Sequence, residues 1–102
     1  MKTIFIKDFS RFPGPRYKHL GEFSGEEFRD DILVPELIAN NGDIEVNLDG
    51  VFGYGSSFLE ETFGGLSRCE IDKNLILKLR ENIVSSDESI KQEVISYIND
   101  SL

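Results

Sequence analysis

The sequence predicts an α/β fold, with a mixed sheet of about four strands and three to four helices that lie mainly on one face of the sheet. Two kinds of periodicity alternate along the chain. Apolar residues at every second position are typical of half-buried strands, and apolar residues every three or four positions are typical of amphipathic helices. Strands that alternate with helices form right-handed βαβ units with parallel central strands. The polar positions within residues 44–49 indicate that only one face of the sheet is deeply covered.

The first third of the chain is predicted to form two strands and a helix. Residues 2–7 are β-branched and aromatic between charged ends, which favours a strand. Prolines then exclude regular structure, and residues 17–20 are expected to return as a second strand. The helix is predicted to begin at Ser24, whose spacing from Glu27 is that of a capping box. Pro35 either kinks this helix or starts it again at its first position.

The central segment, residues 43–66, is expected to organise the chain. Its first part alternates apolar and polar side chains and predicts a strand over residues 44–49. A glycine-rich turn follows over residues 50–55. Ser57 and Glu60 then have the spacing of a second capping box. An apolar stripe of helical period predicts a short helix after it: Phe58, Leu59, Thr62, Phe63 and Leu66.

The last third is predicted to form one more strand and a terminal helix. Leucines alternate with other residues over residues 75–79 and predict a strand, which residues 82–84 extend or bend. Ser85 and Glu88 have the spacing of a third capping box. The stripe that indicates the helix is Ile90, Val94, Ile95, Ile98 and Leu102. Without a linker or a repeat, we expect a single domain over residues 1–102.

The charge of the chain is distributed unevenly. Its 11 Lys and Arg and 19 Asp and Glu residues give a net charge of −8 at pH 7. Residues 1–20 carry a net charge of +4, and residues 21–102 carry −12. A body of this charge repels phosphate backbones, so nucleic-acid binding is not expected, whereas a basic protein partner is compatible with it.

The sequence is expected to belong to a cytoplasmic protein that does not enter a membrane. No apolar run approaches the roughly 20 residues needed to span a bilayer. The first acidic residue, Asp8, comes too early for a secretory signal. Cys69 is the only cysteine and can form no internal disulfide, which is typical of a reducing compartment. A buried thiol is the favoured interpretation of Cys69, and a reactive nucleophile is the alternative.

We recognise no set of catalytic or metal-binding residues in the sequence. His19 is the only histidine, and no cysteine or metal-ligand pattern lies near it. Glu60 and Glu61 are adjacent on the expected helix, so their side chains point about 100° apart and would not share a site. The glycine-rich turn lacks the spacing of nucleotide-binding loops. We therefore expect a non-enzyme without a metal or a cofactor.

Several side chains around the central turn are each open to two interpretations. Ser57 is expected to cap the helix, and Ser56 either simply precedes this cap or is a phosphorylation site. Tyr54 either packs against the body or is exposed as an anchor for a partner. Phe58 belongs either to the core or to a contact surface. Arg16 forms a salt bridge with the acidic body or binds a phosphate or carboxylate.

Short motifs between residues 14 and 66 carry a resemblance to a known family: Gly14-Pro-Arg16, Ser24-Gly-Glu-Glu-Phe-Arg29, Leu48-Asp-Gly-Val51, Gly53-Tyr-Gly-Ser-Ser-Phe-Leu-Glu-Glu61 and Phe63-Gly-Gly-Leu66. In these motifs the chain resembles the bacterial and phage STAS-like domain of unknown function. That family is similar in fold to the STAS domains of anti-sigma-factor antagonists and sulfate transporters. The resemblance implies a STAS-like α/β fold.

The resemblance also implies a role for a serine in the central turn. In antagonist STAS domains, an Asp-Ser-Ser-Gly motif starts the second helix, and a histidine-kinase-like ATPase phosphorylates its first serine. That serine matches Ser56 in this chain, and the second matches Ser57. Gly55 and Phe58 occupy the aspartate and glycine positions of the motif. Phosphorylation of Ser56 would add charge that can switch the binding of a partner.

Together these patterns predict a regulatory module that binds a protein partner, and the resemblance implies a histidine-kinase-like ATPase or another regulator as that partner. The expected contact residues lie in the turn and the following helix: Phe52, Tyr54, Ser56, Phe58 and Glu61. The alternative is a sensor for a small anion or nucleotide, which Ser56, Ser57 and Arg16 would hold at the helix N-terminus. The patterns leave the oligomeric state open.

Overall fold

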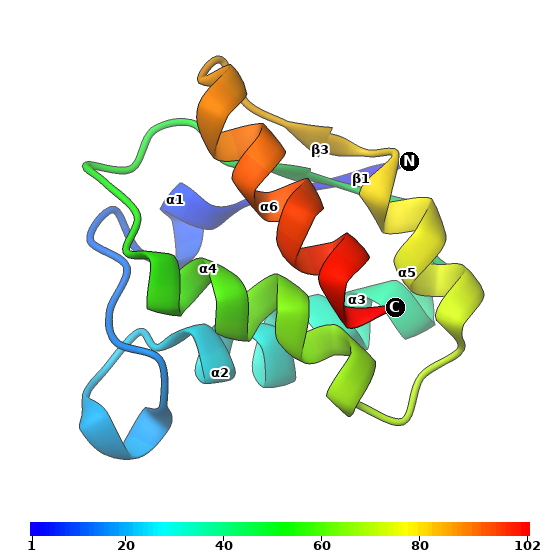
Figure 1. Ribbon diagram of the computed structural model, residues 1–102, viewed down its shortest axis with the longest axis horizontal. Helices are drawn as coiled ribbons and strands as arrows, with labels where there is room; N and C mark the ends of the chain where they lie inside the picture. The colour runs from blue at the N-terminus through cyan, green and yellow to red at the C-terminus, as the bar shows by residue number, and fades with distance from the viewer.

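The computed structural model describes residues 1–102 as a parallel sheet of three strands covered by helices (Figure 1). Ile4 lies opposite Val46 on the neighbouring strand, and Val46 lies opposite Ile83 on the third. All three side chains are buried, whereas Thr3 and Glu45 on the other face are only half-buried. The strands follow the spatial order β1-β2-β3, and their bounds are Lys2–Phe5, Ile44–Asn47 and Ile83–Val84.

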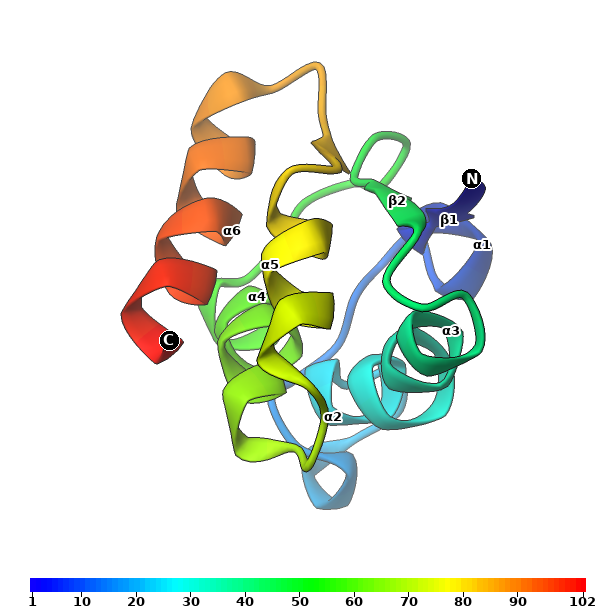
Figure 2. The same cartoon turned by 90° about the vertical axis from the view of Figure 1, so that its right-hand side faces the viewer.

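Helices connect the strands and cover one side of the sheet. Figures 1 and 2 show α2 to α6 on the same side, as expected when successive right-handed crossovers step in one direction. None of the helices combines the length and the apolar character needed to cross a membrane. The helical segments are α1 (Ile6–Phe9), η1 (Lys18–Leu20), α2 (Gly25–Phe28), η2 (Arg29–Leu33), α3 (Val34–Ala39), α4 (Ser56–Phe63), η3 (Gly64–Arg68), α5 (Lys73–Arg80) and α6 (Glu88–Ser101).

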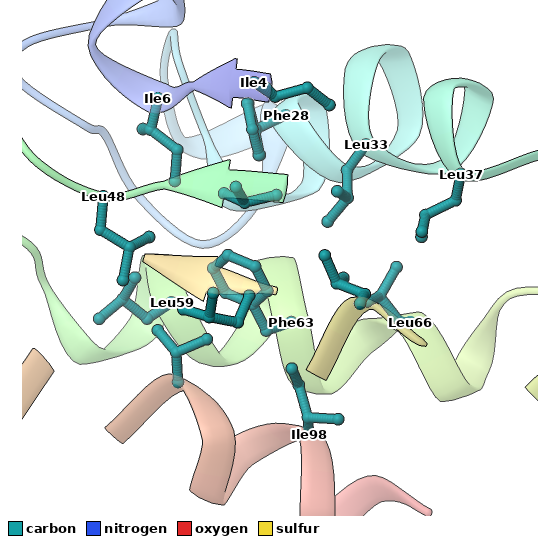
Figure 3. Packing of buried hydrophobic residues seen from close by; sticks show 14 of the residues in the cluster. Ile4, Ile6, Phe28, Leu33, Leu37, Leu48, Leu59, Phe63, Leu66 and Ile98 are labelled. Atoms are coloured by element: carbon teal, nitrogen blue, oxygen red, sulfur yellow. The ribbon is translucent and has the colours of Figure 1, made fainter. Parts of the chain in front are cut away.

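The core lies between the sheet and these helices, where side chains from all parts of the chain converge (Figure 3). A cluster of 17 buried hydrophobic residues forms it. Phe28 of α2 and Phe58 of α4 are fully buried, and their ring centroids lie 6.4 Å apart. Complete burial of one such side chain is worth about 1.5–3 kcal/mol. The contact between α2 and α4 is therefore a major source of stability.

The predicted start of the first long helix is confirmed. Ser24 is the N-cap of α2, and its Oγ accepts a hydrogen bond from the Glu27 amide at 3.0 Å. The Glu27 carboxylate accepts from the Phe23 amide at 3.2 Å rather than from the Ser24 amide. The cap thus keeps the serine half of the predicted capping box, while the glutamate bonds one residue further upstream.

The other two predicted capping boxes are wrong. α4 begins at Ser56 with Gly55 as its N-cap, so Ser57 lies inside the helix and no side chain caps it. α6 is capped by Asp87, whose carboxylate accepts from two amides of the first turn. Ser85 instead accepts from the Asp87 amide at 3.0 Å. A carboxylate is the stronger cap here because its charge is favoured at the positive end of the helix dipole.

The strand predicted over residues 75–79 is also wrong, because these residues belong to α5. Asp72 caps this helix by accepting from the Asn74 amide at 2.9 Å. Ile76 and Leu79, three positions apart, are both buried against the core. Leucine, lysine and arginine are strong helix formers, and the alternation of the leucines matched a strand only by coincidence.

The second strand predicted over residues 17–20 does not form. The segment contains the short 3₁₀ turn η1, and all four of its residues are exposed. β1 pairs with β2 and not with this segment. As a result the sheet has three strands rather than about four, and it is entirely parallel rather than mixed.

Pro35 lies in the first turn of α3, and the turn before it is widened. η2 is a π-helical turn in which the Val34 amide donates to the Arg29 carbonyl, five residues back. Proline has no amide hydrogen, and its ring clashes with the carbonyl four residues back in a regular helix. The wider turn avoids that clash. The backbone at Leu33 and Val34 remains helical, so the helix continues through Pro35 by way of this π turn, and the predicted restart at the proline does not occur.

Replacing Gly25 by alanine is expected to lower the free energy of unfolding by about 1–3 kcal/mol. A Cβ at this position would lie 2.5 Å from the Phe58 carbonyl oxygen, so α2 and α4 would have to move apart. Gly53→Ala is the matched control, since a Cβ there meets nothing within 4 Å. Urea denaturation measures both variants, and equal stability of the two would contradict this account of the helix contact.

Candidate functional site

The turn between β2 and α4 lies at the carboxyl end of the sheet. The chain leaves β2 at Asn47 and passes through residues 48–55 before α4 begins. Residues 85–87, which follow β3, lie beside it, and the two segments line a pocket of about 310 Å³ together with Ile90 of α6. In parallel α/β sheets the loops at this end of the strands are the usual place for functional residues.

Asp49 ties the two segments together. Its Oδ1 accepts hydrogen bonds from the Ser86 amide at 2.8 Å, from the Ser86 hydroxyl at 2.9 Å and from the Ser85 hydroxyl at 3.4 Å. These donors, the Ser86 amide first, hold the pKa of the Asp49 carboxyl below its usual range. The carboxylate thus fixes the turn after β2 against the segment after β3.

Tyr54 packs against the body of the protein, as in the first of its two predicted interpretations. Its hydroxyl donates to the Leu48 carbonyl at 2.6 Å, and its ring centroid lies 6.2 Å from that of Phe58. Burial raises the pKa of Tyr54, and the charge of Asp49 adds to the effect. The left-handed residue of the turn is Gly50, with φ of 89°, rather than either glycine that flanks the tyrosine.

Phe52 and Phe12 form an exposed pair of stacked rings. Their centroids lie 4.6 Å apart with 5° between the ring planes, and the residues are 73% and 70% exposed. Two hydrogen bonds join the loops that carry them. The Phe52 amide donates to the Arg11 carbonyl at 2.8 Å, and Arg11 Nη1 donates to the Gly50 carbonyl at 3.3 Å. Sequence reasoning missed Phe12, because no motif or periodicity links the two loops.

Ser56 and Ser57 are the first two residues of α4, and both are exposed. Arg16, which the anion hypothesis grouped with them, forms ion pairs instead. Its Nη1 lies 3.1 Å from Glu60 Oε2 and 3.4 Å from Glu61 Oε1. The salt-bridge interpretation of Arg16 therefore describes the structure, and its guanidinium is already occupied by carboxylates.

Phe58 and Glu61, two of the expected contact residues, are buried. The Glu61 side chain is 5% exposed, and its carboxylate accepts hydrogen bonds from Arg29 Nη1 and, at 3.1 Å, from Arg68 Nη2. Arg29 Nη1 also donates to the Glu61 carbonyl at 3.0 Å. Burial raises the pKa of the Glu61 carboxyl, but the hydrogen bonds from the arginines outweigh it and hold the pKa below its usual range.

Arg29 reaches Glu61 through a space that only glycine leaves open. A Cβ at Gly65 would overlap the Nη1 atom of Arg29. Arg29 also donates from Nε to Asp30 at 2.9 Å. Burial lowers the pKa of the Arg29 guanidinium, but the bonds to Asp30 and Glu61 raise it overall, so Arg29 itself keeps its positive charge. The Phe63-Gly-Gly-Leu66 motif thus has a packing role.

The remaining candidates for chemistry are Cys69 and His19. Cys69 is half-buried with its Sγ 3.6 Å from the Gly65 carbonyl oxygen, and burial raises the pKa of its thiol. The thiol therefore stays protonated near neutral pH. His19 is exposed, and its ring stacks on Tyr17 with 5.6 Å between centroids. No group of His, Cys, Asp and Glu side chains is arranged to hold a metal ion.

The fold and the turn together define a small α/β domain in which a strand, a fixed glycine-rich turn and a helix display polar and aromatic groups at one end of a parallel sheet. The chain belongs to the family described as the STAS-like domain of unknown function, which matches residues 24–91. The resemblance found in the sequence motifs is thereby confirmed. No curated protein and no solved structure matches the chain.

Glu61→Gln is expected to lower the free energy of unfolding by about 3 kcal/mol at pH 7, because it leaves the buried Arg29 with only the more exposed Asp30 as a counter-ion. Folding lowers the pKa of Glu61. Its contribution to stability is therefore present above the unfolded value of about 4.3 and is lost as the pH falls through the lower folded value. The stability difference between wild type and variant should shrink below about pH 4.

Urea denaturation at several pH values measures this difference. Glu60→Gln is the matched control, since Glu60 is adjacent on α4 but its side chain is 34% exposed. Its loss should cost less than about 1 kcal/mol. Equal costs for the two variants at pH 7 would contradict the role assigned to Glu61.

Proposed function

We propose that this protein is a cytosolic, non-enzymatic regulatory module that docks a protein partner through an aromatic edge, which consists of Phe12, Phe52 and residues 53–57. The stacked rings support this most directly, because two large aromatic side chains are left in water at the same place. Aromatic residues are frequent anchors of protein interfaces, and burying them against a partner is strongly favourable.

The fixed geometry of the aromatic edge also supports docking. Asp49 holds the turn against residues 85–86, and the Tyr54 hydroxyl closes it on the Leu48 carbonyl. Groups that are already ordered lose little conformational entropy on binding, which favours affinity. In this proposal Phe52 and Ser56 contact the partner, whereas Tyr54 and Phe58 pack against each other beneath them and Glu61 is engaged in ion pairs with arginines.

The partner that we propose, by family resemblance, is a histidine-kinase-like ATPase that phosphorylates Ser56. Ser56 is exposed and opens α4 close in sequence to Phe52. A phosphate at this position would be stabilised in the free protein by the amides at the helix N-terminus. On the contact edge, however, it would add about −1.5 to −2 charges that the partner would have to desolvate. Phosphorylation would therefore release the partner.

Phe52→Ala and Phe12→Ala are each expected to lower partner binding at least about tenfold while leaving the melting temperature nearly unchanged, because both side chains are exposed. Ile38→Ala is the matched control, since Ile38 is an apolar residue of α3 that is 57% exposed. Quantitative mass spectrometry of proteins retained by each immobilised variant identifies the partner, and titration with the purified partner measures affinity. If all three variants retain the same proteins in equal amounts, the aromatic edge is not the docking surface.

Ser56→Glu is expected to lower partner binding at least about tenfold in the same titration. The variant should keep or slightly gain stability, because an acidic side chain in the first turn of a helix is favourable by about 0.3–1 kcal/mol. Ser96→Glu, on an exposed position of α6, serves as the control for added charge. Binding of the Ser56 variant at the wild-type level would rule out the phosphorylation switch but not the docking surface.

A further inference from the structure

The free edge of β1 carries an apolar groove that the proposed function does not use. β1 pairs with β2 on one side and with no strand on the other. A groove of about 220 Å³ is lined by every residue of β1 and by no residue of β2. It therefore runs along the unpaired side of the strand.

The hydrogen bonds of β2 show which backbone groups of β1 face this groove. Val46 and Leu48 donate to carbonyls on the β3 side, at 3.0 and 2.8 Å. Backbone groups alternate in direction along a strand, so those of Glu45 face β1. Glu45 is in register with Thr3. In a parallel pair, this register directs the carbonyl of Lys2 and the amide of Ile4 toward β2. The amide and the carbonyl of Thr3 itself then point toward the groove.

The same alternation directs the Phe5 amide toward the groove. The Phe5 carbonyl serves another purpose, because Phe5 is the N-cap of α1 and the carbonyl of an N-cap accepts the first bond of its helix. One carbonyl and two amides, from Thr3 and Phe5, therefore remain at the edge of the sheet. An exposed row of this kind is a template for another strand.

The opposite wall of the groove is one stripe of the helical segment that follows. Phe28 of α2, Ile32 of η2 and Glu36 of α3 all line it, at intervals of four residues. Phe28 is fully buried and Ile4 of β1 is 8% exposed, so the floor of the groove is the hydrophobic core itself. A strand edge that faces a helix stripe suits an extended peptide, whose backbone bonds the edge while alternate side chains enter the groove.

The charges of the groove indicate which peptide fits. Lys2 and Glu36 neutralise each other in an ion pair of 2.9 Å. Lys7 is held over the Phe5 ring, 5.3 Å from its centroid. Asp8 lines the groove just beyond the carboxyl end of β1 and forms no ion pair with another side chain. The protein as a whole carries a net charge of −8. A basic residue beside Asp8 is therefore complementary to both the local and the overall charge.

We propose that the β1 edge binds an extended peptide that joins the sheet as a fourth strand, with apolar residues at alternate positions and a basic residue near its amino end. Antiparallel pairing is the more stable arrangement, and it places the amino end of the peptide beside Asp8. This site is independent of the aromatic edge and of the partner proposed for it.

The probe is a blocked hexapeptide with lysine first, followed by valine and threonine in alternation. In a ¹H–¹⁵N NMR titration, the amide signals of residues 2–5 should shift, and hydrogen exchange of the Thr3 and Phe5 amides should slow at least about tenfold. A matched peptide that begins with glutamate should bind at least about threefold more weakly. Equal binding of the two peptides would overturn the assigned orientation and charge preference.

Thr3→Pro removes an edge amide that does not serve β2, and proline is compatible with an edge strand. It should lower peptide affinity at least about tenfold, whereas Thr3→Val, which keeps the amide, should bind as wild type does. A peptide with N-methyl groups on alternate residues should lose the same affinity for wild type, and this readout does not depend on the folding of any variant.

Three outcomes would overturn the proposal: no shift at millimolar peptide, equal affinity of the N-methylated and parent peptides, or shifts of the same amides with protein concentration alone. Shifts that depend on protein concentration alone would show that a second copy of the chain, rather than a peptide, binds the β1 edge.

Discussion

The buried ion pair between Arg29 and Glu61 determines how the helical layer is assembled. Arg29 comes from the turn that follows α2, and Glu61 comes from the middle of α4. Removal of either partner would leave a buried charge whose remaining counter-ions, Asp30 for Arg29 and Arg16 and Arg68 for Glu61, are more exposed. Because Arg29 also bonds the backbone of α4, the pair fixes the rotation of that helix about its axis. The rotation of α4 in turn determines which side of the helix is exposed, including Ser56 at its start.

The family motifs of this chain serve packing more than chemistry. Gly25 allows α2 to approach α4, and Gly65 leaves room for Arg29. Arg16 and Arg68 complete the charge balance around Glu61. These residues of the family motifs therefore stabilise the packing of the helices. The glycine-rich turn is the motif that remains exposed to solvent. A role in contact with another molecule therefore rests on that turn and on what packs beside it.

Local signals predicted much of the fold. β1 follows from its composition, β2, α4 and α6 follow from their periodicity, and the helix capped by Ser24 follows from its capping chemistry. α5 was missed because three leucines at every second position match a strand, and only the burial of Ile76 and Leu79 reveals the helical period. Residues 17–20 were misassigned because a strand was expected to return there against the first, whereas the segment forms the exposed 3₁₀ turn η1.

The candidate site was predicted only in part. The turn itself and the exposure of Phe52 and Ser56 agree with expectation, since glycines and serines mark a surface turn. The stack of Phe12 on Phe52 and the pairing of Arg29 with Glu61 were not predicted, because each joins residues from distant parts of the chain. Such contacts between distant residues depend on how the helices and strands are arranged in three dimensions, which local sequence patterns do not specify.

The parallel order of the sheet has a consequence for how the chain acquires its structure. β1 is made first, but its only partner strand begins at Ile44, and β3 follows at Ile83. At synthesis rates of about 5–20 residues per second, roughly 4–16 s pass before the last strand is made. No pair of neighbouring strands is joined by a short hairpin that could form earlier. During that interval β1 and β2 lack the third strand and α6, whose buried residues Ile83, Val94 and Ile98 belong to the same core cluster as Ile4 and Val46.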